Sequence, residues 1–155
     1  MNILFVCTGN ISRSFLAEMM LRNEIEQFGI EGISVSSAGL YASPNNPPDP
    51  KMLDYLLKMG ISAIKHRSRK MKREDADWAD SIFVMEKEHA RMIENLWPDA
   101  KEKTMLFGGL VSEGIMPDDI IDPFGRSPYH YRSAQTQITM AVKTLVKRLQ
   151  GHQTK

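Results

Sequence analysis

The sequence has only one cysteine, Cys7, among its 155 residues. A single thiol cannot form a disulfide within the chain, and no basic and then apolar leader precedes the first apolar run, so we expect a cytoplasmic protein. Long apolar runs are absent too, because none approaches the roughly 18 residues that a membrane-spanning helix requires. These absences argue against a secreted or membrane protein, and we expect no membrane partner.

The sequence also lacks a metal-ligand pattern and a large net charge. Its four histidines show no ligand spacing with one another or with Cys7, so we expect no metal. The formal net charge of +1 disfavours nucleic acid as a partner. Cationic residues do cluster between residues 65 and 73, which leaves a nucleic-acid or acidic-partner patch as an alternative to a solvated face.

The overall composition is that of a globular protein, with 42% hydrophobic and 25% charged residues. The length fits one domain over residues 1–155. Strands are predicted at residues 3–6, 33–37, 81–85 and 104–107, and helical segments at 14–29, 51–59, 74–80, 86–96 and from residue 128 onward. Strands and helices that alternate in this way form a parallel sheet covered on both faces, so we predict an α/β fold.

The cysteine lies where the first strand gives way to a short polar loop and then to a helix. Gly9 and Asn10 in this loop are residue types that tolerate positive φ. Loop N–H groups that converge at a helix N-terminus form a site for a phosphate-sized oxyanion, and the same field favours the thiolate form of Cys7. Arg13 adds a planar fork that matches two phosphoryl oxygens. The pattern therefore predicts a phosphoryl-transfer site.

A second candidate for chemistry is Asp122, which precedes Pro123. The proline favours an extended conformation at Asp122 and stiffens the loop, so that the carboxylate can be aimed. A carboxylic acid held over a phosphate site would protonate the leaving oxygen and later deprotonate a water. Asp118 and Asp119 are competitors, but neither is followed by proline and both are expected to be solvated.

These two motifs together resemble a known family. The Cys-x5-Arg-Ser pattern of residues 7–14 resembles the phosphate-binding loop of cysteine-dependent protein tyrosine phosphatases, and its place near the start of the chain is similar to the low-molecular-weight protein tyrosine phosphatase family. The resemblance covers essentially the whole chain. It implies a doubly wound, four-stranded parallel sheet with the phosphate loop after the first strand, and no metal or organic cofactor.

The resemblance also implies roles for individual residues. Cys7 would be the nucleophile, Arg13 the phosphate clamp and Asp122 the general acid. The residues implied to bind phosphate or support the loop are Thr8, Gly9, Asn10, Ile11, Ser12, Ser14, Ser37 and His66, and those implied to line the substrate crevice are Ile11, Leu40, Tyr41 and Phe124. Simple alternatives remain for some of them: a turn for Ser37, an exposed aromatic for Tyr41 and core packing for Phe124.

Three positions bear on how this chain differs within the family. Ser12 stands where many members have a second cysteine, so Cys7 is expected to overoxidise or to be capped by an external thiol. Phe15 replaces the usual proline, and we expect it to alter the rim of the site. Ile11 is apolar, as in tyrosine-directed members, whereas members that act on phosphoarginine tend to have threonine there.

The sequence thus predicts hydrolysis of phosphotyrosine and aryl phosphates through a phosphocysteine intermediate. Alternatives are protein arginine phosphatase activity, disfavoured by Ile11, and arsenate reduction, which needs further cysteines or external thiols. A non-catalytic phosphoprotein-binding module is a third, disfavoured because Cys7, Arg13 and Asp122 are all present. The expected partner is a tyrosine-phosphorylated protein, by analogy a bacterial tyrosine kinase. The oligomeric state is not readable, and a monomer is the default expectation.

Overall fold

The computed structural model describes residues 1–112 and 119–154 of the chain. Its strands are β1 (Asn2–Cys7), β2 (Ser34–Gly39), β3 (Ser81–Val84) and β4 (Thr104–Leu106). Its helices are α1 (Arg13–Phe28), α2 (Pro50–Lys58), α3 (Arg73–Trp78), α4 (Lys87–Leu96), the 3₁₀ helix η1 (Pro98–Lys103), α5 (Gly109–Ser112) and α6 (Pro128–Gln153). All four predicted strands are present, whereas η1 and α5 were not predicted.

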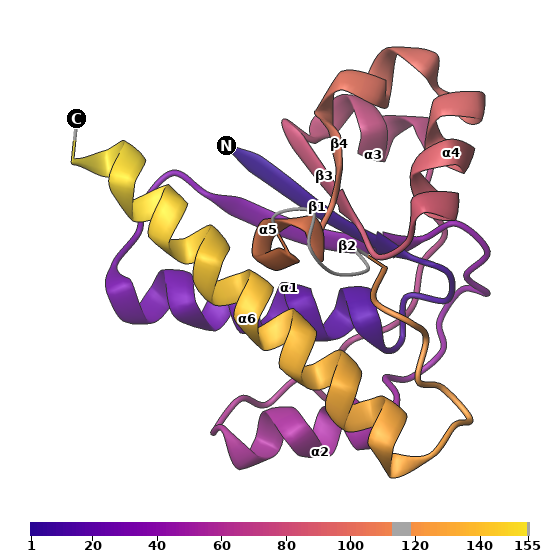
Figure 1. Cartoon of the computed structure of the whole chain (residues 1–155), viewed down its shortest axis with the longest axis vertical. Coiled ribbons are helices and arrows are strands. Elements are labelled where there is room, and N and C mark those ends of the chain that lie inside the picture. The colour runs from indigo at the N-terminus through magenta and orange to yellow at the C-terminus, as the bar shows by residue number, and fades with distance from the viewer. Residues whose placement is uncertain (113–118, 155) are drawn as a thin grey trace.

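The strands form one sheet in the order β2-β1-β3-β4, and every pair is parallel. The predicted α/β class and four-stranded parallel sheet are confirmed. Helices α1 and α6 lie on one face of the sheet, and α3 and α4 lie on the other (Figure 1). Because parallel strands end at the same edge of a sheet, Cys7 at the end of β1 lies at the edge where β2 and β3 also end. There Cys7 is paired with Gly39 of β2. Ligands of open α/β sheets bind at this edge.

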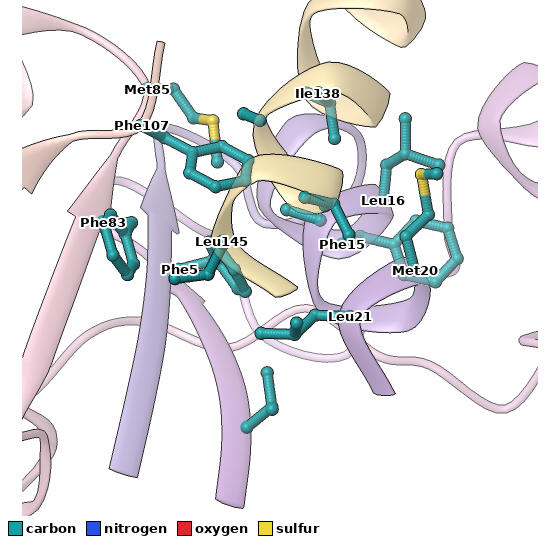
Figure 2. Packing of buried hydrophobic residues seen from close by; sticks show 14 of the residues in the cluster. Phe5, Phe15, Leu16, Met20, Leu21, Phe83, Met85, Phe107, Ile138 and Leu145 are labelled. Carbon is teal, nitrogen blue, oxygen red and sulfur yellow. The ribbon is translucent and has the colours of Figure 1, made fainter. Parts of the chain in front are cut away.

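Strand β1 is buried on both sides, which explains its uninterrupted apolar run. Ile3 and Phe5 face the core that α1 and α6 cover, whereas Leu4 and Val6 face the core beneath α3 and α4. The larger core is built around aromatic rings (Figure 2). The ring centroid of Phe5, for example, lies 4.9 Å from that of Phe107. The central strand is thereby held rigidly from both faces.

Phe15 is part of this larger core and does not lie at the rim of the site, so the structure corrects that expectation. The side chain is fully buried in the cluster, and its ring centroid lies 4.5 Å from that of His66. The reason is its place on α1, whose first turn directs this position inward rather than toward the mouth of the loop. Phe15 therefore packs behind the loop.

Helix α6 reaches the phosphate loop through α2. The Tyr131 hydroxyl of α6 donates to Asp49 Oδ2 at 2.7 Å, and the other oxygen of Asp49 accepts from Lys51 N at the start of α2. The backbone N–H of Asp49 donates to the carbonyl oxygen of Ile11 at 2.9 Å. Burial and the neighbouring carboxylate raise the pKa of Tyr131, which keeps its hydroxyl protonated as a donor. No helix among the described residues is long and apolar enough to cross a membrane.

Candidate active site

Cys7 lies at the end of β1, and the loop that follows turns back over its sulfur. Asn10 adopts a left-handed conformation with φ of 57°, which directs its backbone N–H to Cys7 Sγ at 3.3 Å. The Ser14 hydroxyl lies 3.0 Å from the same sulfur. The sulfur therefore has one hydrogen-bond partner in the loop and one in the first turn of α1. The nucleophile predicted from the sequence thus lies in surroundings that suit it.

Asn10 is the buried hub that holds the loop in shape. Its side-chain N–H₂ donates to Ser14 Oγ at 3.0 Å and to Ser37 Oγ at 2.9 Å, and its side-chain oxygen accepts from the backbone N–H of Arg69 at 3.0 Å. Its carbonyl oxygen lies 2.7 Å from His66 Nε2. Two distant segments and the start of α1 therefore fix one residue, and the structure places both Ser37 and His66 against the loop.

Gly39 allows the end of β2 to pass directly behind the loop. A Cβ atom added at this position would lie 2.5 Å from the carbonyl oxygen of Thr8 and 3.0 Å from the backbone nitrogen of Asn10. Both distances are too short for a side chain. A glycine is therefore required at position 39 by close backbone packing.

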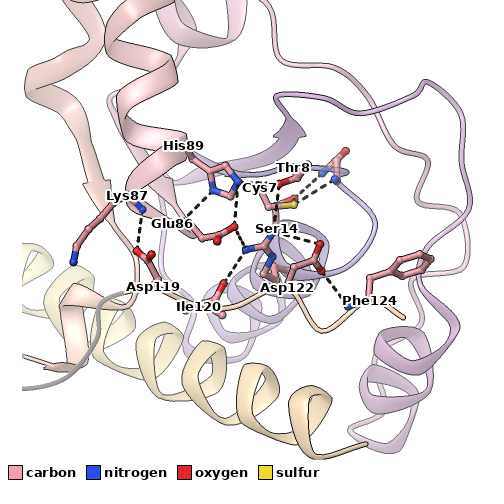
Figure 3. Close-up of polar contacts among 12 residues, drawn as sticks. Cys7, Thr8, Ser14, Glu86, Lys87, His89, Asp119, Ile120, Asp122 and Phe124 are labelled. Atoms are coloured by element: carbon pink, nitrogen blue, oxygen red, sulfur yellow. Dashed lines mark hydrogen bonds and ion pairs between the residues drawn. The ribbon is translucent and has the colours of Figure 1, made fainter. Parts of the chain in front are cut away.

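Arg13 is almost completely buried and is held by one of its terminal nitrogens; its partners Glu86, Ile120 and Asp122 are labelled in Figure 3. Nη1 donates to Glu86 Oε2 at 2.7 Å and to the carbonyl oxygen of Ile120 at 2.8 Å. Nη2 lies 3.6 Å from Asp122 Oδ2. Nε is buried and has no hydrogen-bond partner among the described residues. A buried guanidinium N–H without an acceptor is costly, and a phosphoryl oxygen would satisfy it.

Glu86 and His89, which sequence reasoning missed, form a second layer next to Arg13 (Figure 3). Glu86 is the N-cap residue of α4, and its backbone N–H lies 3.1 Å from His89 Nδ1. The other ring nitrogen, Nε2, lies 3.0 Å from Thr8 Oγ1. Their position directly after a buried strand, at the edge that also carries Cys7, was the available signal.

The electrostatics of this layer keep His89 neutral. Burial, and then the positive charge of Arg13, lower the pKa of His89 to about 4, against the opposing effect of Glu86, Asp119 and Asp122. A backbone N–H can only donate, so Nδ1 accepts from Glu86 and the ring proton lies on Nε2. His89 is therefore a donor toward Thr8 at neutral pH.

Asp122 lies on the opposite side of the site, on the loop that follows the sheet. Its Oδ1 accepts from the backbone N–H of Phe124 at 3.1 Å, and about half of its side chain is exposed. The neighbouring candidate Asp119 instead accepts from the backbone N–H of Lys87 at the start of α4. Asp118 lies outside the described residues. Of the described carboxylates on this loop, Asp122 is the one that lines the pocket.

The pocket over the thiol has a volume of about 220 Å³. It is lined by Cys7, Thr8, Gly9, Asn10, Ile11, Ser12, Arg13, Asp122 and Phe124. Two buried polar atoms of these residues, Ser12 Oγ and Arg13 Nε, have no partner among the described residues. A tetrahedral oxyanion with several acceptor oxygens fits this donor set. Clusters of three or more potential metal ligands are absent from the described part of the chain.

Two residues expected in the crevice lie elsewhere. Leu40 is buried in the core beneath α3 and α4, because the backbone continues the inward direction of β2. Tyr41 is 68% exposed, and neither residue is part of the pocket lining given above. Their backbone N–H groups support the loop instead, because they donate to the carbonyl oxygens of Cys7 and Thr8, each at 3.0 Å. Phe124 does line the pocket and is 56% exposed.

Comparison with known proteins gives consistent matches along the chain. The family model described as "Low molecular weight phosphotyrosine protein phosphatase" matches residues 2–155. A protein-arginine-phosphatase from Geobacillus stearothermophilus is 36% identical over 97% of both chains. The low molecular weight protein-tyrosine-phosphatase Etp from Escherichia coli is 33% identical over 96% of this chain and 94% of its own.

Solved structures agree with these sequence matches. The YwlE arginine phosphatase from Geobacillus stearothermophilus superimposes with a TM-score of 0.87 over 98% of this chain and 94% of its own, at 36% identity. The tyrosine phosphatase Wzb from Escherichia coli K30, in complex with sulphate, superimposes with a TM-score of 0.83 over 96% of this chain and 97% of its own, at 30% identity. The relatives named protein-tyrosine-phosphatases are phosphoric monoester hydrolases. Since the family match spans nearly the whole sequence, the chain belongs to the low molecular weight phosphotyrosine protein phosphatase family.

Proposed function

We propose that the protein is a cytoplasmic protein tyrosine phosphatase that works through a phosphocysteine intermediate. The observation that carries this proposal is the state of Arg13. Its Nη1 is anchored to Glu86 and Ile120, while Nε is buried and has no partner among the described residues, in a pocket that Cys7 also lines. An arginine held in this way presents one edge to two phosphoryl oxygens and needs no reorganisation on binding.

In the first step, the Cys7 thiolate attacks phosphorus opposite the phenolic oxygen. The S–P bond forms as the P–O bond to the tyrosine breaks, and the loop amides and Arg13 bind the equatorial oxygens. The Asp122 carboxyl group gives its proton to the departing phenolate. Asp122 is suited to this because it lines the pocket 3.6 Å from Arg13 Nη2, on the solvent side.

In the second step, a water attacks the phosphocysteine. The Asp122 carboxylate now accepts a proton from that water, an O–P bond forms and the S–P bond breaks. The Ser14 hydroxyl, 3.0 Å from the sulfur, stabilises the returning thiolate. Inorganic phosphate leaves and the enzyme returns to its starting state.

Phosphotyrosine is favoured by the apolar walls of the pocket mouth. Ile11 and Phe124 both line it, and they offer hydrocarbon and an aromatic ring against a flat phenol. Phosphoarginine is the second candidate, because a relative at 36% identity is named a protein-arginine-phosphatase. Its guanidinium N–H groups would, however, face the Ile11 side chain, which has no acceptor.

The activity is tested by the hydrolysis of an aryl phosphate by the wild type, Cys7→Ser and Asp122→Asn. We expect Cys7→Ser to lose turnover and Asp122→Asn to lose roughly 10²–10⁴-fold in kcat. Failure of the folded, reduced wild type to turn over, while phosphate still binds, would contradict catalysis and support a binding module. Hydrolysis that is retained in the Cys7→Ser preparation would come from a source other than this site.

Substrate choice is tested with phosphotyrosine and phosphoarginine peptides of the same sequence. The wild type is expected to favour phosphotyrosine, and Ile11→Thr to shift the ratio of kcat/KM values toward phosphoarginine. Ile11→Val is the matched control, since it keeps the branch without a hydroxyl. Equal kcat/KM values for the two peptides with the wild type would overturn the preference.

The partner that we propose is a tyrosine-phosphorylated protein, with a bacterial tyrosine kinase as the first to examine. Substrate trapping with Asp122→Ala would identify it. A further expectation follows from Ser12, because Cys7 is the single cysteine of the chain. Mass spectrometry after peroxide treatment should find Cys7 as sulfinic or sulfonic acid, or capped when a small thiol is present.

A further inference from the structure

The hydroxyl group of Thr8 lies between two donors at the edge of the pocket. His89 Nε2 is 3.0 Å from Thr8 Oγ1 on one side, and Arg13 Nη2 is 3.4 Å from it on the other. A hydroxyl oxygen has two acceptor sites and one proton. The direction of that proton therefore depends on whether both neighbours donate.

Both neighbours do donate. A guanidinium group has no acceptor, so the contact with Arg13 has a single polarity. His89 receives the backbone N–H of Glu86 on Nδ1, which places the ring proton on Nε2 and directs it at Thr8. The groups that face this imidazole are Arg13, Glu86, Asp119 and Asp122, and together with burial they leave its pKa at about 4. The ring thus stays neutral over the working pH range.

With both of its acceptor sites occupied, Thr8 keeps one free proton, and Thr8 lines the pocket together with Cys7 and Arg13. We infer that the Thr8 hydroxyl donates a hydrogen bond to a phosphoryl oxygen of the substrate, and that His89 is the positioning residue that makes it a donor. This inference rests on the proposed function and adds a side-chain donor to the loop amides. Figure 3 shows Thr8, His89 and Arg13's partner Glu86 gathered on this side of the site.

The free proton matters because the ligand is a dianion. A hydroxyl that could accept as well as donate would lose part of its donor character to any neighbour that needed an acceptor. Here the protein has occupied both lone pairs in advance, so the hydroxyl does not need to reorient when phosphate binds. Hydrogen bonds to charged groups are the stronger class, and loss of one reduces affinity by roughly tenfold or more.

The matched variants are Thr8→Val and Thr8→Ser. Valine keeps the shape of threonine without the hydroxyl, whereas serine keeps the hydroxyl. Inhibition constants for inorganic phosphate and for vanadate, measured together with kcat/KM, should worsen by roughly tenfold or more in Thr8→Val and stay within about threefold of the wild type in Thr8→Ser. Unchanged phosphate affinity in folded Thr8→Val, or equal losses in both variants, would overturn the inference.

His89 is tested through two variants and one spectroscopic signature. His89→Leu should weaken phosphate binding about as much as Thr8→Val does. His89→Gln should recover part of that loss, because its side-chain N–H₂ can replace Nε2–H. ¹⁵N NMR of the wild type should identify the Nε2–H tautomer of a neutral ring at pH 7. Finding the Nδ1–H tautomer or a protonated ring would contradict the assignment whatever the activity.

These measurements also separate this inference from the proposed catalysis. Phosphate binding to the Cys7→Ser protein, followed by calorimetry, does not need turnover. If the wild type fails to hydrolyse aryl phosphates but Thr8→Val still weakens phosphate binding, the Thr8 assignment stands and the catalytic proposal falls. If the wild type turns over aryl phosphates but Thr8→Val binds phosphate as well as the wild type does, the catalytic proposal stands and the Thr8 assignment falls.

Discussion

The two halves of the candidate active site differ in how firmly the surrounding structure holds them. On one side, Asn10 and Ser12 of the loop after β1 are buried, and Asn10 alone is bound by the start of α1 and by two distant segments. On the other, Asp122 is about half exposed and is held by the neighbouring backbone and a 3.6 Å approach to Arg13. Binding a dianion requires fixed donors, whereas a group that gives and later takes a proton must reach two different oxygens.

This contrast predicts that substitutions in the two halves will have different effects on stability and on catalysis. Changes behind the phosphate loop should lower the free energy of unfolding and catalysis together. Changes on the Asp122 side should lower catalysis alone. The following variants test this division by the size of their effect on stability, in decreasing order.

Gly39→Ala should be the most damaging. Its new Cβ would lie 2.5 Å from the Thr8 carbonyl oxygen, in a place where neither backbone can retreat. We expect a loss of about 3–5 kcal/mol in the free energy of unfolding, measured by urea denaturation. Gly109→Ala is the matched control, because its added Cβ would lie 3.7 Å from the nearest atom, an ordinary contact. Similar stability of the two variants would refute close packing at Gly39.

Asn10→Ala should cost about 3 kcal/mol. It removes the side-chain partners of Ser14, Ser37 and the Arg69 N–H, and it places a residue with a Cβ and no local hydrogen bond at φ of 57°. Asn10→Gly relieves the backbone and keeps only the loss of hydrogen bonds. It should therefore lie between alanine and the wild type in thermal melts; an equal loss would mean that the conformation contributes nothing.

His89 should make stability depend on pH. Its pKa is about 4 in the folded protein and about 6.5 when unfolded, so between these values the unfolded chain binds more protons. The stabilisation is complete above pH 6.5 and declines as pH falls toward 4, by roughly 3 kcal/mol in total. His89→Gln should lack this part of the pH dependence. Denaturation curves at several pH values for both proteins make the comparison.

Asp122→Ala should change stability least, by less than about 0.5 kcal/mol, although it removes the proposed general acid. Its side chain is half exposed, and its backbone contact with Phe124 closes a surface turn. Urea denaturation at pH 7 tests this directly. A loss of stability comparable to that of Asn10→Ala would show that the loop that carries Asp122 is held as rigidly as the loop after β1.

Residues that are close in sequence, or paired by a local pattern, could be predicted. Cys7 and Arg13 occupy one strand, loop and helix start, and the proline after Asp122 marked its loop. Glu86 and His89 were missed because their sequence indicates only the start of a helix; their contacts with Arg13 and Thr8 depend on the order of strands in the sheet. Hydrophobic periodicity also says little about which contacts the residues of a loop after a strand will make.

Leu40 and Phe15 illustrate the same limit from the side of packing. Each was expected near the mouth of the site because of its neighbours in sequence, yet each is buried. The direction of a side chain at the end of a strand or in the first turn of a helix depends on which core lies behind it. Here those cores are completed by α4 and α6, which come much later in the chain.

The link from α6 to the loop through Tyr131 and Asp49 has a consequence for the protein during its synthesis. On the ribosome, the loop after β1 and its cysteine are synthesised well before α6, the helix that supports Ile11 and covers α1. A nascent chain that stops before α6 leaves the larger core open to water and the loop without this support. We therefore expect a chain in which α6 has not yet been made to be unable to remove phosphate from a neighbouring protein.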